Sequence, residues 1–275
     1  MTLKEILIIG ARAIGSHEAK FLLSHITGYS QIDLIIKSNQ PLDKQAKGAF
    51  FAALNRRIAK EPLQYILGEW EFMGLKMKTD KRALIPRPET ELLVEEALVH
   101  INKLNRPANV LDVCTGSGCI AVAIAKLTEA SVTAIDISKD ALELATENAS
   151  LHGLNKKIYF LHSDLLQNHK HQTYDIIISN PPYVTKAELA NIQPELYSEP
   201  ILALDGGNDG MDLYRRLIPQ SMQYLVSGGI LLLEIGPFAV EAIMREAGYD
   251  IVQLIKDYSG LARVLVGQKT GGSNA

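Results

Sequence analysis

The sequence predicts an α/β fold with a mostly parallel sheet of seven strands, preceded by a small helical domain and a linking β-hairpin. From residue 109 onward, apolar runs of strand length alternate with helical patterns, which is typical of a parallel sheet covered on both faces. No helical pattern separates the last two runs, so we expect them to pair as an antiparallel hairpin at one end of the sheet. The predicted strands are 109–113, 131–136, 157–162, 174–179, 229–235, 249–256 and 261–267.

The N-terminal part of the chain has the sequence pattern of short helices. Thr2 and Glu5 have the spacing of a capping box, which predicts a helix over residues 6–14. Ser16 is expected to cap a second helix, and a third is expected over residues 41–59, beginning at a proline and an aspartate.

Changes in composition then divide the chain. Apolar and charged residues alternate around two glycines between residues 63 and 84, which predicts a β-hairpin linker. Two prolines stiffen the following loop, and Pro88 suits the first turn of a helix over 89–102. The final residues hold no core-forming side chain. We therefore expect a helical substrate-docking domain over 1–62, the linker over 63–84, a catalytic domain over 85–269 and a disordered tail over 270–275.

Composition excludes several classes of protein. The net charge of −3 argues against a nucleic-acid substrate, because proteins that bind nucleic acids usually carry a basic excess. No apolar run reaches the roughly 18 residues of a membrane-spanning helix, so no membrane partner is expected. The two cysteines, Cys114 and Cys119, lie close together and do not predict a disulfide framework, so a cytoplasmic, reducing setting is expected. No metal site is expected.

A run of small residues follows the first strand of the predicted sheet and leads into a helix. Glycines allow a ligand to approach the backbone, and the helix N-terminus offers unpaired N–H groups. Asp136 ends the next strand, where an acid can accept both hydroxyls of a ribose. These features predict a site for a nucleoside-bearing cofactor. The loop residues assigned to it are Cys114, Thr115, Gly116, Ser117 and Gly118.

Two assignments at this site remain open from the residues alone. The loop also satisfies the Gly-x-Gly-x-x-Ala form of the dinucleotide fingerprint, so a nicotinamide-dependent dehydrogenase or a nucleotide-binding module without catalysis is an alternative. Asp164 ends the third strand. It is either an acceptor for the amino group of adenine, with Leu165 packed on the ring, or a helix or turn cap.

The run Asn180, Pro181, Pro182 and Tyr183 follows the buried strand 174–179. Prolines cannot donate ladder hydrogen bonds, so the strand stops there. The side-chain oxygen of Asn180 and the carbonyl of Pro181 could accept both N–H bonds of a planar amino group, with Tyr183 packed against that group. Such a grip would aim the nitrogen at the methyl of a sulfonium, and catalysis would come from positioning and electrostatics. The motif therefore favours S-adenosylmethionine as the cofactor. A tight proline turn without a catalytic role is the alternative.

These residues resemble a known family. Class I methyltransferases with Asn-Pro-Pro-Tyr after the fourth strand act on exocyclic or side-chain amino nitrogens. The stretch Ile85–Glu91 resembles the signature of the release factor glutamine methyltransferases, and residues 57–68, 199–212 and 231–236 are also similar to that family. The resemblance implies a Rossmann-like class I methyltransferase fold and S-adenosyl-L-methionine. It also implies methylation of the glutamine in the Gly-Gly-Gln loop of class 1 peptide chain release factors, which the N-terminal domain helps to hold.

The resemblance leaves some points open. The family usually has glycine where this chain has Cys114, and a cysteine there costs ~1 kcal/mol or more if the position has a positive φ. Arg87 either lines the substrate entrance or anchors its loop by a salt bridge. The nearest alternative function is methylation of a ribosomal-protein glutamine, although that family tends to carry Pro-Arg-Ser-Pro in place of residues 86–89. An adenine amino methyltransferase acting on DNA or RNA is less compatible with the net charge of −3.

Overall fold

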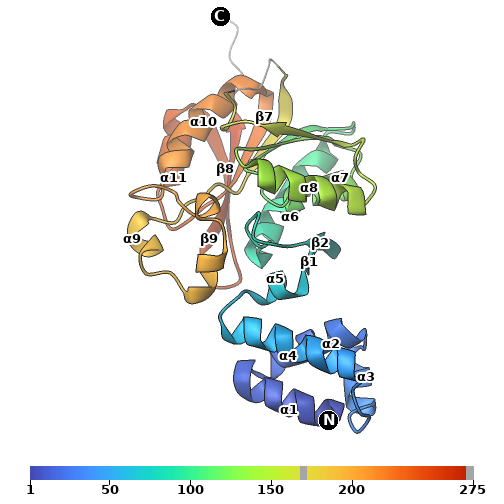
Figure 1. The fold of residues 1–275 in the computed structure, drawn as a ribbon. Coiled ribbons are helices and arrows are strands. Elements are labelled where there is room, and N and C mark those ends of the chain that lie inside the picture. Colours follow the sequence, from blue (N-terminus) through green and yellow to red (C-terminus); the bar gives the residue numbers. More distant parts are fainter. Residues whose placement is uncertain (168–171, 271–275) are drawn as a thin grey trace, which may run out of the picture. The chain divides into compact units, whose positions relative to one another are not determined.

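The computed structural model describes residues 1–167 and 172–270, and the chain forms two compact units (Figure 1). The first unit comprises residues 1–69 and 193–198, and the second comprises residues 70–192 and the chain from residue 199 onward. Apart from Thr270, the expected tail over 270–275 lies outside the described residues. No helix in the described ranges is long and apolar enough to cross a membrane.

The first unit is helical. The predicted capping box is present, since the Glu5 amide donates to Thr2 Oγ1 and the Thr2 amide donates to Glu5 Oε2. Asp43 caps the fourth helix, where its Oδ1 accepts the Ala46 amide at 2.8 Å. Buried leucines and Phe50 form the core of this unit. Its helices are α1 (Leu3–Ile14), α2 (Ser16–Thr27), α3 (Gln31–Ile36), α4 (Lys44–Ile58) and α5 (Leu63–Leu67).

Two expectations for this part of the chain are wrong. Ser16 does not cap α2, because Gly15 occupies the N-cap position with a φ of 87° and no side chain bonds the helix end. Residues 63–67, which were assigned to the hairpin linker, form α5 instead. Pro62 precedes this helix, and Gly68 ends it in the left-handed conformation. The hairpin itself is shorter and consists of β1 (Glu69–Phe72) and β2 (Leu75–Lys78).

The second unit is built on a seven-stranded sheet with the order β5-β4-β3-β6-β7-β9-β8. Five neighbouring strands are parallel, and β9 is antiparallel to both β7 and β8. The predicted mostly parallel sheet and its terminal hairpin are therefore confirmed. The strands are β3 (Asn109–Val113), β4 (Ser131–Asp136), β5 (Ile158–His162), β6 (Tyr174–Ser179), β7 (Leu225–Glu234), β8 (Tyr249–Lys256) and β9 (Ala262–Lys269).

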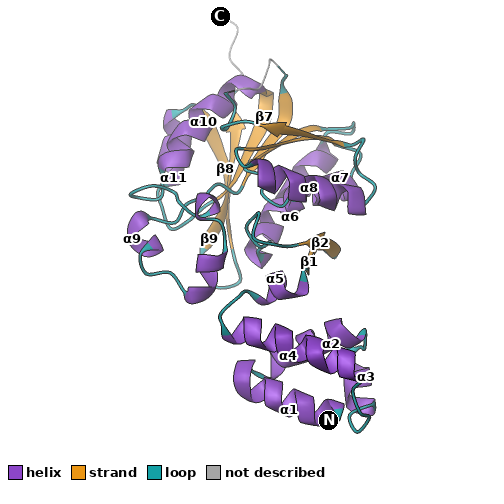
Figure 2. Cartoon of the chain, in the orientation of Figure 1, coloured by secondary structure: helices purple, strands orange, loops and turns teal. Residues whose placement is uncertain are grey.

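Helices cover both faces of this sheet (Figure 2). Ile176 and Ile178 of β6 belong to one apolar core with α6 and α7, while Ile177 belongs to the other core with α10 and α11. This alternation follows from the period of two in a strand. The helices are α6 (Pro88–Lys103), α7 (Cys119–Leu127), α8 (Lys139–Leu151), α9 (Lys186–Leu189), α10 (Asp212–Tyr224) and α11 (Val240–Glu246). Pro88 lies in the first turn of α6, as predicted.

The strand order reverses at β3. The chain proceeds from β3 to β4 and β5 on one side, and then places β6 and β7 on the other side. Open α/β sheets leave a crevice at such a switch point, outside the carboxyl ends of the strands. The topology therefore directs a ligand to the loops that follow β3 and β6.

Candidate active site

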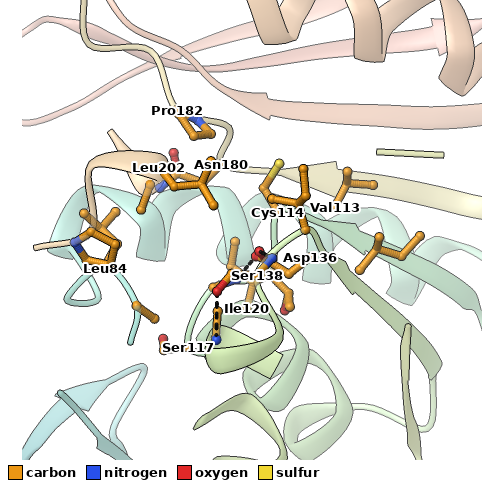
Figure 3. Close-up of a pocket in the computed structure, with 18 of the residues that line it drawn as sticks. Leu84, Val113, Cys114, Ser117, Ile120, Asp136, Ser138, Asn180, Pro182 and Leu202 are labelled. Carbon is orange, nitrogen blue, oxygen red and sulfur yellow. Dashed lines mark hydrogen bonds between the residues drawn. The ribbon is translucent and has the colours of Figure 1, made fainter. Parts of the chain in front are cut away.

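A pocket lies at the carboxyl ends of β3, β4, β5 and β6 (Figure 3). Each strand contributes the loop that follows it, and the loop before α6 closes another side. The predicted site residues that line the pocket are Arg87, Cys114, Thr115, Gly116, Ser117, Asp136, Asp164, Leu165, Asn180 and Pro182. Gly118, Pro181 and Tyr183 do not appear among the lining residues in the described part of the chain. The fold thus brings together most residues of the predicted cofactor site and of the predicted site for a planar amino group.

The loop after β3, residues Cys114–Gly118, owes its shape to three positive φ angles. These are 61° at Cys114, 54° at Gly116 and 79° at Gly118. A Cβ on Gly118 would lie 2.8 Å from Cβ of Ala145, so this glycine also permits close packing of α8. Cys114 occupies the left-handed region that favours glycine, so the conformational cost of ~1 kcal/mol or more applies to this chain.

The two cysteines are free thiols. Burial raises the pKa of Cys114 well above its ordinary value, with the nearby Asp136 as the next cause. Burial likewise raises the pKa of Cys119 to about 12. Both side chains are therefore neutral thiols near pH 7. Since the thiolate is the reactive form, neither is poised as a nucleophile.

Asp136 is held against the loop after β3. Its Oδ2 accepts the Gly116 amide at 2.8 Å, and its Oδ1 accepts the Ser138 amide at 2.8 Å (Figure 3). Burial raises the pKa of Asp136, while the amides of Ser138 and Gly116 act in the opposite direction. The carboxyl group is thus oriented by the backbone and still borders the pocket, where it can accept the hydroxyls of a ribose.

Asp164 has a partner that the sequence did not indicate. Its Oδ2 accepts a hydrogen bond from Arg216 Nη2 of α10 at 2.6 Å, and Arg216 also lines the pocket. Leu165 is buried at the pocket wall with a φ of 49°. The two residues therefore present a carboxylate and an apolar surface side by side at the pocket.

The Asn180 amide has a defined orientation. Its Nδ2 donates to Thr90 Oγ1 at 3.1 Å, so Oδ1 is the atom left to accept a hydrogen bond in the pocket. Pro181 is buried, and Pro182 lies at the pocket wall instead. Tyr183 is half-buried outside the pocket lining, and its hydroxyl donates to Glu234 Oε1 at 3.4 Å. Thr90 and Glu234 lie in stretches that resemble the family, but neither was predicted as a site residue.

Arg87 forms the salt bridge that one of its two predicted roles requires. It forms an ion pair with Glu199, whose side chain is only 2% exposed, and it also lines the pocket. Glu199 Oε2 accepts the Ile85 amide at 3.0 Å. The ion pair therefore anchors the loop before α6 at the pocket entrance.

Asn148 is a further residue that sequence reasoning missed. It is fully buried in α8, and its Nδ2 donates to the Ser117 carbonyl at 2.9 Å. Its Oδ1 accepts the Lys78 amide at 2.7 Å. Asn148 thus ties the loop after β3 to the hairpin. An asparagine within a helical pattern carries no signal of this kind, because its partners lie far away in the sequence.

Comparisons with known proteins agree with this geometry. A model of the methyltransferase small domain matches residues 89–207, and a model of the PrmC N-terminal domain matches residues 11–68. The chain is 38% identical to the release factor glutamine methyltransferase of Thermodesulfovibrio yellowstonii, over 96% of each chain. It is also 38% identical to that of Deinococcus radiodurans, over 93% of this chain and 91% of the relative. The chain belongs to the release factor glutamine methyltransferase family.

The chain also matches a methyltransferase with another substrate in its name and two solved structures of lower sequence identity. The ribosomal protein uL3 glutamine methyltransferase of Francisella tularensis is 37% identical over 82% of this chain and 73% of its own length. A methyltransferase structure from Pyrococcus furiosus matches with a TM-score of 0.54 at 18% identity, over 83% of this chain and all of that one. The hMettl16 catalytic domain matches with a TM-score of 0.59 at 15% identity, over 92% and 91%. The two structures show that the fold is that of the methyltransferases.

Family membership makes the chain a methyltransferase that uses S-adenosylmethionine, which confirms the predicted fold class and cofactor. The pocket fits this cofactor, because Asp136 borders it and nothing lies within 4 Å of where a Cβ on Gly116 would be. Family membership, rather than the shape of the pocket, excludes the nicotinamide alternative.

Proposed function

We propose that this protein transfers a methyl group from S-adenosylmethionine to the side-chain amide nitrogen of a glutamine in class 1 peptide chain release factors, in their Gly-Gly-Gln loop. The observation that carries the proposal is the Asn180 amide at the pocket, turned by its hydrogen bond to Thr90 so that Oδ1 is available as an acceptor. The names of relatives that match almost the whole chain support the release factor as the substrate.

The chemistry follows from the weakness of an amide nitrogen as a nucleophile, since its lone pair is delocalised into the carbonyl. Asn180 Oδ1 and the Pro181 carbonyl accept the two N–H bonds of the glutamine amide and fix the direction of attack. The bound cofactor supplies an electrophilic methyl group on a sulfonium. The nitrogen gains positive charge as it bonds to the methyl carbon and the methyl–sulfur bond breaks, which leaves S-adenosylhomocysteine. The two acceptor oxygens stabilise this charge, and the proton that the nitrogen then loses passes to solvent.

The remaining roles in this proposal follow from the loops around the pocket. Cys114–Gly118 and Asp136 hold the cofactor, Asp164 and Leu165 bind its adenine, and Arg87 borders the substrate entrance. Pro182 and Tyr183 shape the substrate site. The N-terminal helical domain, residues 1–62, holds the release factor, and its match to the PrmC N-terminal domain supports this role. We also propose a cytoplasmic setting, because both cysteines are free thiols.

Methylation of ribosomal protein uL3 is the second candidate, because the Francisella tularensis relative bears that name. The chain covers a larger share of the release factor enzymes, up to 96% of their length against 73%. This difference favours the release factor as the substrate.

Transfer of label from radioactive S-adenosylmethionine tests both candidates. Purified enzyme is incubated with an intact class 1 release factor, with its Gln→Ala variant in the Gly-Gly-Gln loop, and with uL3. We expect label in the intact release factor alone. Equal labelling of both release factor proteins, or of neither, would contradict the proposal, and labelling of uL3 alone would establish the second candidate.

A further inference from the structure

Three polar side chains from distant parts of the chain form a continuous hydrogen-bonded series beside the pocket. Asn180 Nδ2 lies 3.1 Å from Thr90 Oγ1, and Thr90 Oγ1 lies 2.7 Å from Glu234 Oε2. Thr90 and Glu234 are each 2% exposed, so water does not offer either one an alternative partner. The three residues follow β6, begin α6 and end β7, and we call them the amide relay.

The amide relay has a direction when Glu234 is ionised. A carboxylate can only accept hydrogen bonds, so Thr90 must donate its single hydroxyl proton to Glu234. Thr90 Oγ1 can then serve Asn180 only as an acceptor. Asn180 must therefore present its NH₂ group to Thr90 and its oxygen to the pocket. The carboxylate of Glu234, two hydrogen bonds away along the relay, thus decides which end of the Asn180 amide faces the substrate.

We propose that Thr90 and Glu234 are positioning residues, which hold the Asn180 amide with its oxygen toward the methyl-accepting nitrogen. This inference rests on the proposed function, in which Asn180 Oδ1 accepts an N–H of the substrate glutamine. In the inverted orientation, the NH₂ group of Asn180 would face the NH₂ group of the substrate. Two donors would then be opposed, and the acceptor that stabilises positive charge on nitrogen would be absent.

The scaffold around Glu234 is rigid. The Tyr214 hydroxyl of α10 donates to the Glu234 backbone carbonyl at 2.8 Å, and Glu234 pairs with Val264 of β9 in the sheet. These contacts fix the backbone from which the Glu234 carboxyl group reaches Thr90.

The ionisation of Glu234 couples the amide relay to pH. Burial raises the pKa of Glu234 to about 7, and the charge of Glu89 acts in the same direction. The Thr90 hydroxyl, the charge of Arg263 and the Tyr183 hydroxyl lower it. Burial also raises the pKa of Tyr183 to about 12, so that its hydroxyl keeps its proton. A protonated Glu234 can donate to Thr90, which frees the threonine proton to turn toward Asn180 Oδ1.

Paired threonine variants test the relay. Thr90→Val removes the hydroxyl and keeps the side-chain shape, Thr90→Ser keeps the hydroxyl, and Thr146→Val removes a helix hydroxyl on α8 as a matched control. The readouts are the single-turnover rate of release factor methylation at pH 8 and the dissociation constant of S-adenosylhomocysteine. We expect Thr90→Val to be about tenfold slower with unchanged cofactor affinity, which corresponds to the loss of one hydrogen bond. Thr90→Ser should recover most of the rate, and Thr146→Val should behave as wild type.

A pH profile adds a readout that a purely structural role would not change. The wild-type rate should fall as the pH drops through about 7, whereas Glu234→Gln should give a profile without that step between pH 6 and 8, whatever its absolute rate. A glutamine amide does not titrate, so its hydrogen bonding to Thr90 does not change over this range. Cofactor affinity measured at each pH separates this step from the titration of Asp112, whose pKa burial also raises to about 7.

The outcomes are distinguishable. Thr90→Val with the wild-type rate, Thr90→Ser as slow as Thr90→Val, or Glu234→Gln with the wild-type pH profile would each overturn the amide relay. Absence of methylation by the wild-type enzyme at pH 8 would instead overturn the proposed function.

Discussion

The loop after β3 and the amide relay lie at neighbouring edges of one pocket, yet they are built from different parts of the chain. In Cys114–Gly118 the backbone determines the shape, through three residues with positive φ. In the amide relay the side chains of Asn180, Thr90 and Glu234 determine the orientation of one amide group. The pocket thus joins a half made by main-chain conformation to a half made by side-chain hydrogen bonds.

The two halves also carry different energetic costs. The cost in the loop after β3 is conformational, because Cys114 adopts a φ of 61° that favours glycine. The cost in the amide relay is electrostatic, because a carboxyl group that must be ionised is almost fully buried at Glu234. In the first half, a change of side chain is therefore expected to matter through the positive φ or through contact with a neighbour. In the second half it should matter wherever a donor or acceptor is lost.

The largest effect is expected for Asn180→Ala, which removes the proposed acceptor. Turnover should fall by roughly 10²–10³-fold, the usual cost of one preorganised transition-state hydrogen bond. The dissociation constant of S-adenosylhomocysteine, measured by calorimetry, should stay within about twofold. Asn155→Ala is the matched control, since that asparagine is exposed and bonds only Ser150 among the described contacts. If Asn180→Ala keeps turnover near the wild-type value, Asn180 is not the acceptor, and the two halves of the pocket do not differ in the way described above.

The next effect concerns the buried charge of Glu234. Its pKa in the folded protein is raised to about 7 from an ordinary 4.5, so the folded state keeps this proton to a higher pH than the unfolded state. The stability it contributes is present below pH 4.5 and is lost as the pH rises through about 7. Relative to wild type, Glu234→Gln should therefore gain stability between pH 5 and 8, on the order of 3 kcal/mol. Urea unfolding at pH 5 and pH 8 measures the free energies of unfolding of the two proteins. A difference between them that does not change with pH would show that ionisation of the buried carboxyl group costs no stability.

A smaller effect should separate the two glycines of the loop after β3. A Cβ at Gly118 would meet Ala145, whereas a Cβ at Gly116 would meet nothing within 4 Å. Both alanine variants meet the positive-φ penalty, but Gly118→Ala should cost about 2 kcal/mol more through overpacking. Thermal unfolding of the two variants provides the comparison. If they are equally stable, α8 can retreat from the loop, and close packing is not what Gly118 provides.

The smallest effect is expected for Cys114→Gly. Relief of the left-handed conformation should exceed the entropy that glycine adds to the unfolded chain, for a net gain of about 0.5 kcal/mol. Cys114→Ala keeps a Cβ at the same φ and should show no gain. Calorimetric unfolding of the three proteins resolves the order. Equal stability of the glycine and alanine variants would mean that the loop holds no strain at this position.

Much of the fold could be predicted because its signals are local. The strands before the loops at Cys114 and Asn180 begin and end as predicted, since buried apolar runs bounded by glycine or proline mark such strands clearly. The start of β7 was predicted at residue 229, but the strand begins at Leu225. The pattern could not reveal this, because Gly228 and Gly229 look like a break in a strand. Residues 63–67 were missed as a helix because five residues are too few to show a helical period.

The sequence by itself determined the parallel sheet, the loop after β3 and the proline-terminated strand before Asn180, since each depends on neighbouring residues. Only the tertiary structure decided how those parts are oriented. Thr90 meets Glu234 across 144 residues, Arg87 meets Glu199 across 112, and Arg216 meets Asp164 across 52. Such contacts leave no periodicity in the chain, because their partners come together only when the sheet and its helices have packed. The sequence thus indicates where an amino nitrogen could be held. The folded structure determines whether the oxygen or the NH₂ group of Asn180 faces that nitrogen.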